Sequence, residues 1–260
     1  MNERKQVFVI GLDDFNLKKL QRLPEAKECD FLSAVEINEM RGVKNLNIQK
    51  IIDKACERID NHGKIDAIVS YYDFPGTTIT PIIAEKYGLP GSSLESVMKC
   101  EHKYWSRLEQ NKVIPLSLPK FAAFDPFDDK AYQHIEMIPP FWIKPIKSYR
   151  SFLAYRINSE YQFNEYMEEV RAHINFMSEP FNEIFKSYHL PREFTDMKET
   201  MIAETPITGH QSTIEGYVYD GEVVVYGIVD SVVEEDRSSF TRYEYPSSLP
   251  QEIQFRMADL

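Results

Sequence analysis

The sequence predicts an α/β fold for the first third of the chain and an α+β arrangement for the rest. Up to about residue 95, short apolar runs typical of buried strands alternate with segments of helical periodicity. From about residue 140, strand-like runs instead follow one another across tight turns, which is typical of antiparallel pairing. We therefore expect a Rossmann-like, doubly wound unit followed by a region of antiparallel sheets.

The first region contains three predicted strands, each followed by a predicted helix. The strands are expected at 6–12, 29–37 and 65–72, and the helices at 15–23, 47–60 and 78–87. The turn after the first strand reads GLDDF, where a dinucleotide-binding fold needs the glycine-rich GxGxxG turn. Asp13 and Asp14 would repel a pyrophosphate at that point, so the sequence disfavours an NAD-dependent dehydrogenase.

The second region is less regular. We expect an exposed helix over 101–112, a proline-punctuated connector over 113–121, an antiparallel pair formed by 140–146 and 151–157, and a long helix over 160–177. The charged and proline-containing segment 178–199 predicts a mobile insertion or a partner-facing element. Three strand-like runs follow at 200–207, 212–220 and 222–231, with Asp220-Gly221 as a two-residue hairpin turn, and a helix is expected from residue 251.

Composition excludes several classes of function. The formal charge of −11 disfavours nucleic-acid binding, because phosphate backbones attract the opposite field. The start of the chain is polar and no run of about 18 apolar residues occurs, so neither a signal peptide nor a membrane span is predicted. Three widely spaced cysteines suit reduced thiols in a cytoplasmic protein. No zinc pattern, P-loop or nucleophile elbow is present.

The order of features resembles the ATP-grasp superfamily, specifically carboxylate–amine ligases of the carbamoyl-phosphate synthetase and biotin carboxylase type. Four stretches carry the resemblance: GLPGSSLESV, CEHKYWSRLEQNKVIP, FWIKP and IAETPITGHQSTIEGYVYDGEV. The resemblance implies a pre-ATP-grasp domain at 1–95, a lysine-bearing helix and connector at 96–139, a lid subdomain at 140–207, and the start of an ATP-grasp core subdomain at 208–260.

Two lysines are the expected phosphate contacts. By resemblance these are Lys103 and Lys144, which would neutralise different phosphates of ATP from opposite walls of a cleft. Apolar neighbours are expected to bury the stem of Lys144 on its strand. The alternatives are a solvated lysine at 103 and a snorkelling structural lysine at 144.

The hinge and the hairpin supply the remaining expected ATP contacts. The resemblance places adenine recognition at Glu204 and Thr205, and Pro206 offers no amide hydrogen there. Gln211 stands where the family has a ribose-binding glutamate, which replaces a charge-assisted bond by an amide. Glu215 matches the acidic residue of the hairpin strand. For both glutamates an ordinary charge at the sheet surface remains the alternative.

The turn after Lys144 departs from the family because it contains no glycine to close backbone amides over the phosphates. Ser148 and Ser151 can donate hydroxyl bonds, while Lys147 and Arg150 add positive charge. We expect either a lid that holds phosphate by side chains or one that has lost tight closure.

The expected cofactors are ATP and Mg²⁺, although no metal ligand is assigned. In the family, Mg²⁺ is held by a Glu and a Glu-x-Asn pair on a strand that would follow Leu260, so the core subdomain is expected to be incomplete. Asp230, Glu234, Glu235 and Asp236 do not match that pattern. A solvated acidic loop is the simpler interpretation of the last three.

The expected function is an ATP-dependent ligase that activates a small carboxylate as an acyl phosphate for attack by an amine. No catalytic side chain is assigned. Tyr71, Tyr72 and Asp73 follow the third strand at the sheet edge where α/β proteins bind ligands, and they are candidates for substrate recognition. The alternative is a catalytically incomplete or regulatory nucleotide-binding module. A homo-oligomer is left open.

Overall fold

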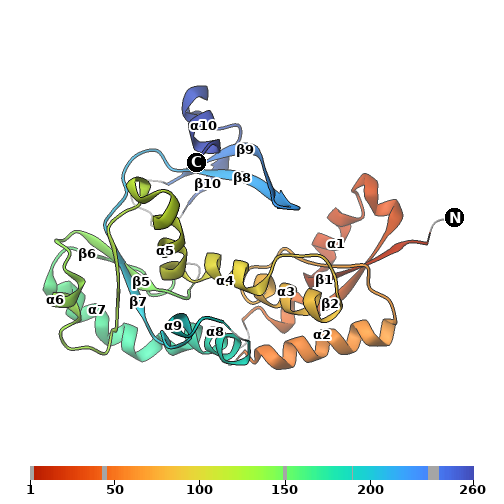
Figure 1. Cartoon of the computed structure of the whole chain (residues 1–260), viewed down its shortest axis with the longest axis horizontal. Helices are drawn as coiled ribbons and strands as arrows, with labels where there is room; N and C mark the ends of the chain where they lie inside the picture. The colour runs from red at the N-terminus through yellow and green to blue at the C-terminus, as the bar shows by residue number, and fades with distance from the viewer. Residues whose placement is uncertain (1–2, 43–45, 149–150, 189, 234–239) are drawn as a thin grey trace.

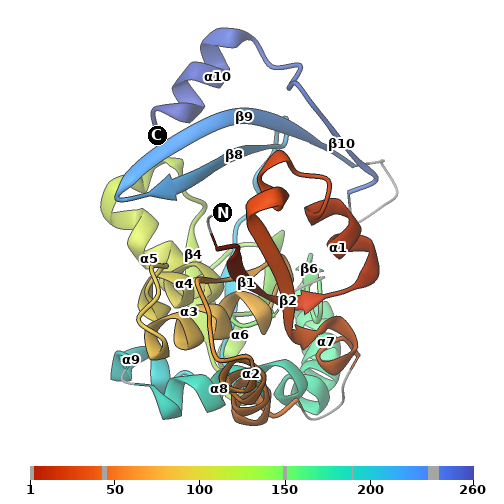
Figure 2. The ribbon, with the colours of Figure 1, turned by 90° about the vertical axis from the view of Figure 1, so that its right-hand side faces the viewer.

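A computed structural model describes residues 3–42, 46–148, 151–188, 190–233 and 240–260. Figure 1 shows three units: a parallel sheet with its helices at one end, a four-stranded antiparallel sheet at the other, and a three-stranded sheet above both. The view turned by 90° (Figure 2) shows β8 (Ser212–Tyr219) and β9 (Glu222–Val232) crossing over the other units. Beneath them, α2 (Ile48–His62) and α8 (Asn175–Ser187) lie side by side. The mixed α/β class that the sequence predicts is confirmed.

The N-terminal unit is the expected Rossmann-like arrangement. Its parallel sheet has the order β2-β1-β3. The elements are β1 (Lys5–Leu12), α1 (Asp14–Leu20), η1 (Pro24–Glu28), β2 (Cys29–Glu36), η2 (Ile37–Glu39), α2 (Ile48–His62), β3 (Ala67–Ser70) and α3 (Gly76–Lys86). Asn47 caps the start of α2, which ends at Gly63 in the left-handed conformation.

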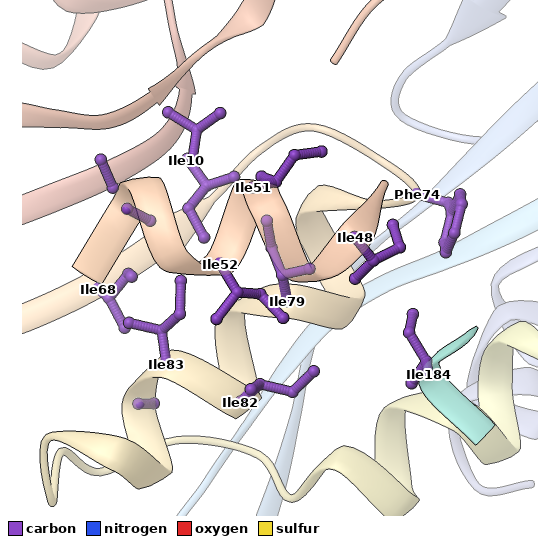
Figure 3. Packing of buried hydrophobic residues seen from close by; sticks show 14 of the residues in the cluster. Ile10, Ile48, Ile51, Ile52, Ile68, Phe74, Ile79, Ile82, Ile83 and Ile184 are labelled. Carbon is purple, nitrogen blue, oxygen red and sulfur yellow. The ribbon is translucent and has the colours of Figure 1, made fainter. Parts of the chain in front are cut away.

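Isoleucines dominate the core of this unit. Figure 3 shows them converging from β1, β3, α2 and α3, with Ile184 of α8 reaching the same cluster. Their spacing along α2, at 48, 51, 52 and 59, places them on one helical face. This face holds α2 against the sheet, and it leaves the carboxyl ends of the strands to the loops that follow them.

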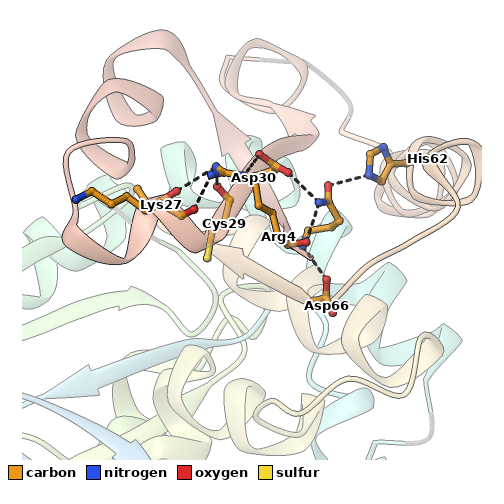
Figure 4. A network of polar contacts seen from close by, with 8 residues as sticks. Arg4, Lys27, Cys29, Asp30, His62 and Asp66 are labelled. Atoms are coloured by element: carbon orange, nitrogen blue, oxygen red, sulfur yellow. Dashed lines mark hydrogen bonds and ion pairs between the residues drawn. The ribbon is translucent and has the colours of Figure 1, made fainter. Parts of the chain in front are cut away.

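A polar network closes the opposite, amino-terminal end of the sheet (Figure 4). Arg4 Nε donates to Asp30 Oδ1 at 2.7 Å, and the Gln6 side chain bridges Asp30 and His62 at 2.9 Å from each. The Gln6 amide donates to Asp66 Oδ2 at 2.8 Å. These hydrogen bonds tie the starts of β1, β2 and β3 to one another.

Two helices connect the units, where the sequence predicts a single exposed helix over 101–112. They are α4 (Leu94–Glu101) and α5 (Lys103–Val113), followed by η3 (Pro115–Ser117). The chain breaks at His102, whose Nδ1 accepts the Trp105 amide at 3.1 Å and caps α5. The prediction of an exposed helix is wrong, because Trp105 is buried and stacks on Phe194.

The four-stranded antiparallel sheet has the order β4-β7-β5-β6. Its elements are β4 (Phe121–Phe124), α6 (Ala131–Ile135), β5 (Phe141–Pro145), β6 (Tyr155–Ile157), α7 (Glu160–His173) and β7 (Met201–Glu204). The expected antiparallel pairing of β5 with β6 is present. β4 begins at the last residue of the predicted connector 113–121, within the segment 96–139, and pairs with β7, so the sheet extends beyond the predicted lid segment.

The segment 178–199 is not a mobile or partner-facing insertion. It forms most of α8 (Asn175–Ser187) and all of α9 (Arg192–Thr195). Phe181, Ile184 and Phe185 are buried in the N-terminal core, and Phe181 stacks on Phe74 with ring centroids 3.8 Å apart. The apolar spacing of i, i+3 and i+4 gives α8 a buried face despite its charged remainder.

The third sheet has the order β10-β9-β8 and carries a terminal helix. Its elements are β8 (Ser212–Tyr219), β9 (Glu222–Val232), β10 (Arg242–Glu244) and α10 (Gln251–Ala258). Asp220 and Gly221 both have positive φ, 49° and 80°, as a type I′ hairpin requires. Within the described ranges, the longest apolar helices fall short of what crossing a bilayer demands.

Candidate functional site

Lys144 lies on the face of β5 opposite to the core. The strand buries Phe141, Ile143 and Pro145 on one side, so Trp142 and Lys144 point to the other. Lys144 Nζ lies 2.5 Å from Glu204 Oε2 at the end of the neighbouring strand β7. The side chain of Lys144 is 30% exposed and that of Glu204 only 8%. The apolar setting of Lys144 is therefore compensated by a buried carboxylate.

Glu204 is held by a second cation that the sequence argument did not single out. Arg107 Nε donates to Glu204 Oε1 at 2.5 Å. Burial acts to raise the pKa of Glu204, but Lys144 and Arg107 together outweigh burial and lower it. The signal that identifies Arg107 is its spacing, because it follows Lys103 by four residues and so stands one turn further along α5.

Lys103 opens α5 and contacts the chain just beyond β5. Its amide donates to the Ile146 carbonyl at 2.9 Å, and its Nζ donates to the Ser148 carbonyl and lies 3.3 Å from Ser148 Oγ. Burial, followed by the charge of Lys144, lowers the pKa of Lys103 to about 8, against the attraction of Glu101, Asp73 and Glu204. Lys103 forms no ion pair among the described residues.

Lys103, Arg107, Lys144 and Glu204 form one cluster, which we call the lysine cluster. It joins the first two turns of α5 to β5 and β7, and Ser148 stands at its edge. Two of the cations, Arg107 and Lys144, pair with Glu204, while Lys103 has neutral oxygen contacts and feels the charges of Glu101 and Asp73 from further away. Anions, and phosphates in particular, are the ligands that such a charge distribution attracts.

The rest of the predicted lid does not gather at this cluster. Lys147, expected to add charge near phosphate, is only 1% exposed and contacts α8 and the chain just after α9 instead. Its Nζ donates to Asn182 Oδ1 at 2.5 Å and to the Met197 carbonyl at 3.1 Å. Ser151 is exposed with a φ of 55°, and Arg150 lies outside the described residues. The expectation for Lys147 is therefore wrong.

The predicted adenine and ribose contacts are divided between two sheets. The Thr205 amide donates to the Lys120 carbonyl at 2.9 Å and its Oγ1 accepts the Lys120 amide at 3.0 Å. The backbone amide and the hydroxyl oxygen of Thr205, next to the hinge residue Glu204, are therefore both used in bonds to Lys120. Gln211 is exposed and Glu215 half-buried, on or beside β8, and neither bonds to the lysine cluster within the described part of the chain.

The Tyr71–Asp73 loop lies at the carboxyl end of β3, and one of its charges acts on the lysine cluster. Asp73 is among the charges that act to raise the pKa of Lys103. The Tyr71 hydroxyl donates to the Gly11 carbonyl, and burial raises the pKa of this phenol. Gly11 has a φ of 83°, and a Cβ there would stand 3.0 Å from Tyr72 Cβ. The loop is thus packed closely against the end of β1.

The described residues do not fit a resident magnesium ion. They contain no group of three or more His, Cys, Asp or Glu side chains that meets the requirements of a metal site. Asp230 is fully engaged by Ser247, Ser248 and His210, and its bond with Ser247 leads the contacts that lower its pKa. Residues 234–236, which include the remaining acidic candidates, lie outside the described ranges.

Comparison with known proteins gives a consistent result for the fold. No family model and no curated sequence matches the chain. Among solved structures, the L-amino acid ligase from Bacillus licheniformis superimposes with a TM-score of 0.69 at 17% identity, over 100% of this chain and 60% of that one. The present chain thus spans about 60% of that ligase's length.

Two further structures contain a nucleotide. The D-alanine–D-alanine ligase from Bacillus anthracis complexed with ATP has a TM-score of 0.60 at 14% identity, over 99% of this chain and 76% of that one. The N5-carboxyaminoimidazole synthetase from Staphylococcus aureus complexed with ADP has a TM-score of 0.64 at 11% identity, over 99% and 62%. The chain has the fold of these ligases.

Proposed function

We propose that the chain binds ATP at the lysine cluster and acts as an ATP-dependent carboxylate–amine ligase. The observation that carries the proposal is the cluster itself, in which Lys103 and Lys144 approach from a helix and a strand and are close enough for the charge of Lys144 to lower the pKa of Lys103. Among the described residues, the Nζ of Lys103 bonds to neutral oxygens of Ser148 and to no carboxylate, so an incoming phosphate would supply a direct counter-ion. The nucleotide-bound ligases of the same fold support this choice of ligand.

In the proposed reaction, a substrate carboxylate attacks the γ-phosphorus of ATP and ADP leaves. The amine then attacks the carbonyl carbon of the resulting acyl phosphate, which expels inorganic phosphate and forms the amide after loss of a proton. Lys103 and Lys144 would neutralise charge on the phosphoryl group during its transfer. Arg107 would keep Glu204 charged and in place when Lys144 turns from Glu204 toward phosphate.

Mg²⁺ enters this proposal only as the partner of the nucleotide in solution. Because the described residues do not fit a resident ion, no step is assigned to the metal. If lysines provide most of the affinity, ATP binding should persist when EDTA replaces Mg²⁺.

The second candidate is a nucleotide-binding module without turnover. Two observations favour it: Lys147 is buried away from the cluster, and the described residues offer no metal site. Binding would then be retained while phosphoryl transfer is lost. This module and the ligase differ in turnover, and both require nucleotide binding.

Isothermal titration calorimetry with ATP and ADP tests the shared step. We expect Lys103→Met and Lys144→Met to weaken ATP binding by about tenfold to a hundredfold, the loss of one or two charge-assisted bonds. Lys103→Met should have the larger effect, since Lys144 is already paired with Glu204. Lys130→Met, an exposed lysine at the start of α6, is the matched control and should bind normally.

Phosphate release with a panel of carboxylates and amines then separates the two candidates. Turnover with any pair supports the ligase, and nucleotide binding without turnover across the panel supports the module. The absence of any ATP or ADP binding by the wild-type chain at millimolar concentrations would refute both.

A further inference from the structure

A cavity of about 420 Å³ lies between α3 and α4, beside the end of β3. Hydroxyl groups and one carboxylate line it, together with an apolar floor that includes Ile68, Pro81 and Val97. Its volume lies within the range of small-molecule sites. The polar lining that matters here comprises Ser70, Thr77, Thr80, Ser96, Cys100 and Glu101.

The hydroxyl hydrogens on the β3 and α3 side of this α3–α4 cavity are already used within the protein. The bonds run from Ser70 Oγ to the Tyr72 carbonyl at 3.0 Å, from Thr77 Oγ1 to Glu101 Oε1 at 2.5 Å, and from Thr80 Oγ1 to the Gly76 carbonyl at 2.7 Å. Because each hydroxyl has a single hydrogen, these three oxygens can offer only lone pairs to a ligand. This wall therefore selects a hydrogen-bond donor.

Glu101 adds a negative charge that has no cationic partner. Its Oε1 accepts from Thr77, whereas no described residue donates to Oε2 or lies within ion-pair distance. Burial raises the pKa of Glu101, and Asp73 acts in the same direction while Thr77 and Lys103 oppose. The described residues that line the cavity include no lysine, arginine or histidine. A desolvated carboxylate in this setting is stabilised by a cation supplied from outside.

We propose that the α3–α4 cavity binds a small molecule through its primary ammonium group, with Glu101 as the counter-ion. An ammonium group has three hydrogens to donate, and the wall presents acceptor oxygens around a carboxylate. An anion would meet only like charge, and a divalent metal would lack the several carboxylates that it prefers. The apolar floor accommodates the aliphatic part of the ligand.

This inference does not depend on nucleotide binding, since it uses none of the lysine cluster. The probe is n-propylammonium, and the matched neutral probe of the same shape is 1-propanol. Ligand-observed NMR should detect millimolar binding of propylammonium and at least tenfold weaker binding of propanol. Glu101→Gln should abolish the preference for the ammonium probe. Glu95→Gln, an exposed carboxylate on the same helix, should retain it.

Cys100 provides a second, local measurement. It is exposed on the wall of the cavity, while Cys56 is buried and Cys29 lies on β2. Propylammonium should slow iodoacetamide alkylation of Cys100, measured by mass spectrometry, and leave Cys29 unaffected. Ser96→Leu, at an exposed position on the wall, should fill the cavity and remove this protection. Equal protection by propanol, or full protection in a folded Glu101→Gln protein, would overturn the proposal.

Discussion

Replacing Lys147 by Met tests how burial sets the charge of a lysine. Lys147 is 1% exposed and its ammonium rests on neutral oxygens of Asn182 and Met197. Burial lowers its pKa to about 7, and only the more distant Glu199 opposes this. Met has a similar length and no charge, so a thioether and methyl group would take the place of the ammonium, whose Nζ lies 5.4 Å from the centre of the Phe185 ring.

The magnitude follows from proton linkage. In the unfolded chain the pKa of a lysine is about 10.5, so folding releases the Lys147 proton between about pH 7 and pH 10.5. Within this window the unfolded state binds more protons, and the free energy of unfolding therefore rises with pH. The slope approaches about 1.4 kcal/mol per pH unit, which amounts to about 2 kcal/mol between pH 7 and pH 9. Below pH 7 both states hold the proton and the effect levels off.

The assay is urea unfolding at pH 6, 7, 8 and 9, followed by circular dichroism and by tryptophan fluorescence. The quantity of interest is the free energy of unfolding of the wild type minus that of Lys147→Met. Lys103, whose pKa is about 8, titrates in both proteins and its contribution largely cancels in this difference. The difference should rise by about 2 kcal/mol from pH 7 to pH 9. A difference that stays constant or falls with pH would refute the reasoning. For the control variant Lys130→Met, the difference in the free energy of unfolding from the wild type should not change with pH.

Three further tests concern ion pairing, packing and backbone conformation. Glu204→Gln should lower the free energy of unfolding by about 3 kcal/mol or less, because it leaves two partly buried cations without their carboxylate; urea unfolding measures it. Ile184→Ala should lower the free energy of unfolding by about 2–5 kcal/mol, because Ile184 is buried. Phe176→Ala, at an exposed position on the same helix, should lower it by less than about 0.5 kcal/mol. Equal losses for the two variants would contradict a buried face on α8. Gly11→Ala should lower the melting temperature more than Gly88→Ala, since both have positive φ but only Gly11 faces a close neighbour.

The elements that the sequence predicts well are those with local determinants. The strand expected at 6–12 is observed as Lys5–Leu12, and the hairpin at Asp220-Gly221 forms with the required positive φ angles. A continuous apolar run and a turn that needs two left-handed residues leave few alternatives in any context. The same holds for α2, whose apolar face, N-cap and terminal glycine all lie within one short stretch.

The predictions that failed depend on contacts distant in sequence. Whether the helix at 101–112 is exposed depends on Phe194, some 90 residues later, which stacks on Trp105. The segment 178–199 has a charged and proline-containing composition, yet its aromatic residues pack in the core of the N-terminal sheet, whose three strands all end before residue 71. Composition describes the average of a segment, whereas burial is decided by one face of it.

Within the site, Lys103 and Lys144 also show that contacts distant in sequence decide the environment of a residue. The sequence sets Lys144 among apolar neighbours, but the β5–β7 pairing places it beside Glu204, whose charge already compensates it. Phosphate must compete with that carboxylate or share the lysine with it. Lys103 looked like an ordinary helical lysine, yet burial lowers its pKa and its partners are neutral. An anion therefore gains more from Lys103, and an ATP affinity lost mainly through Lys144 would place the nucleotide differently from this proposal.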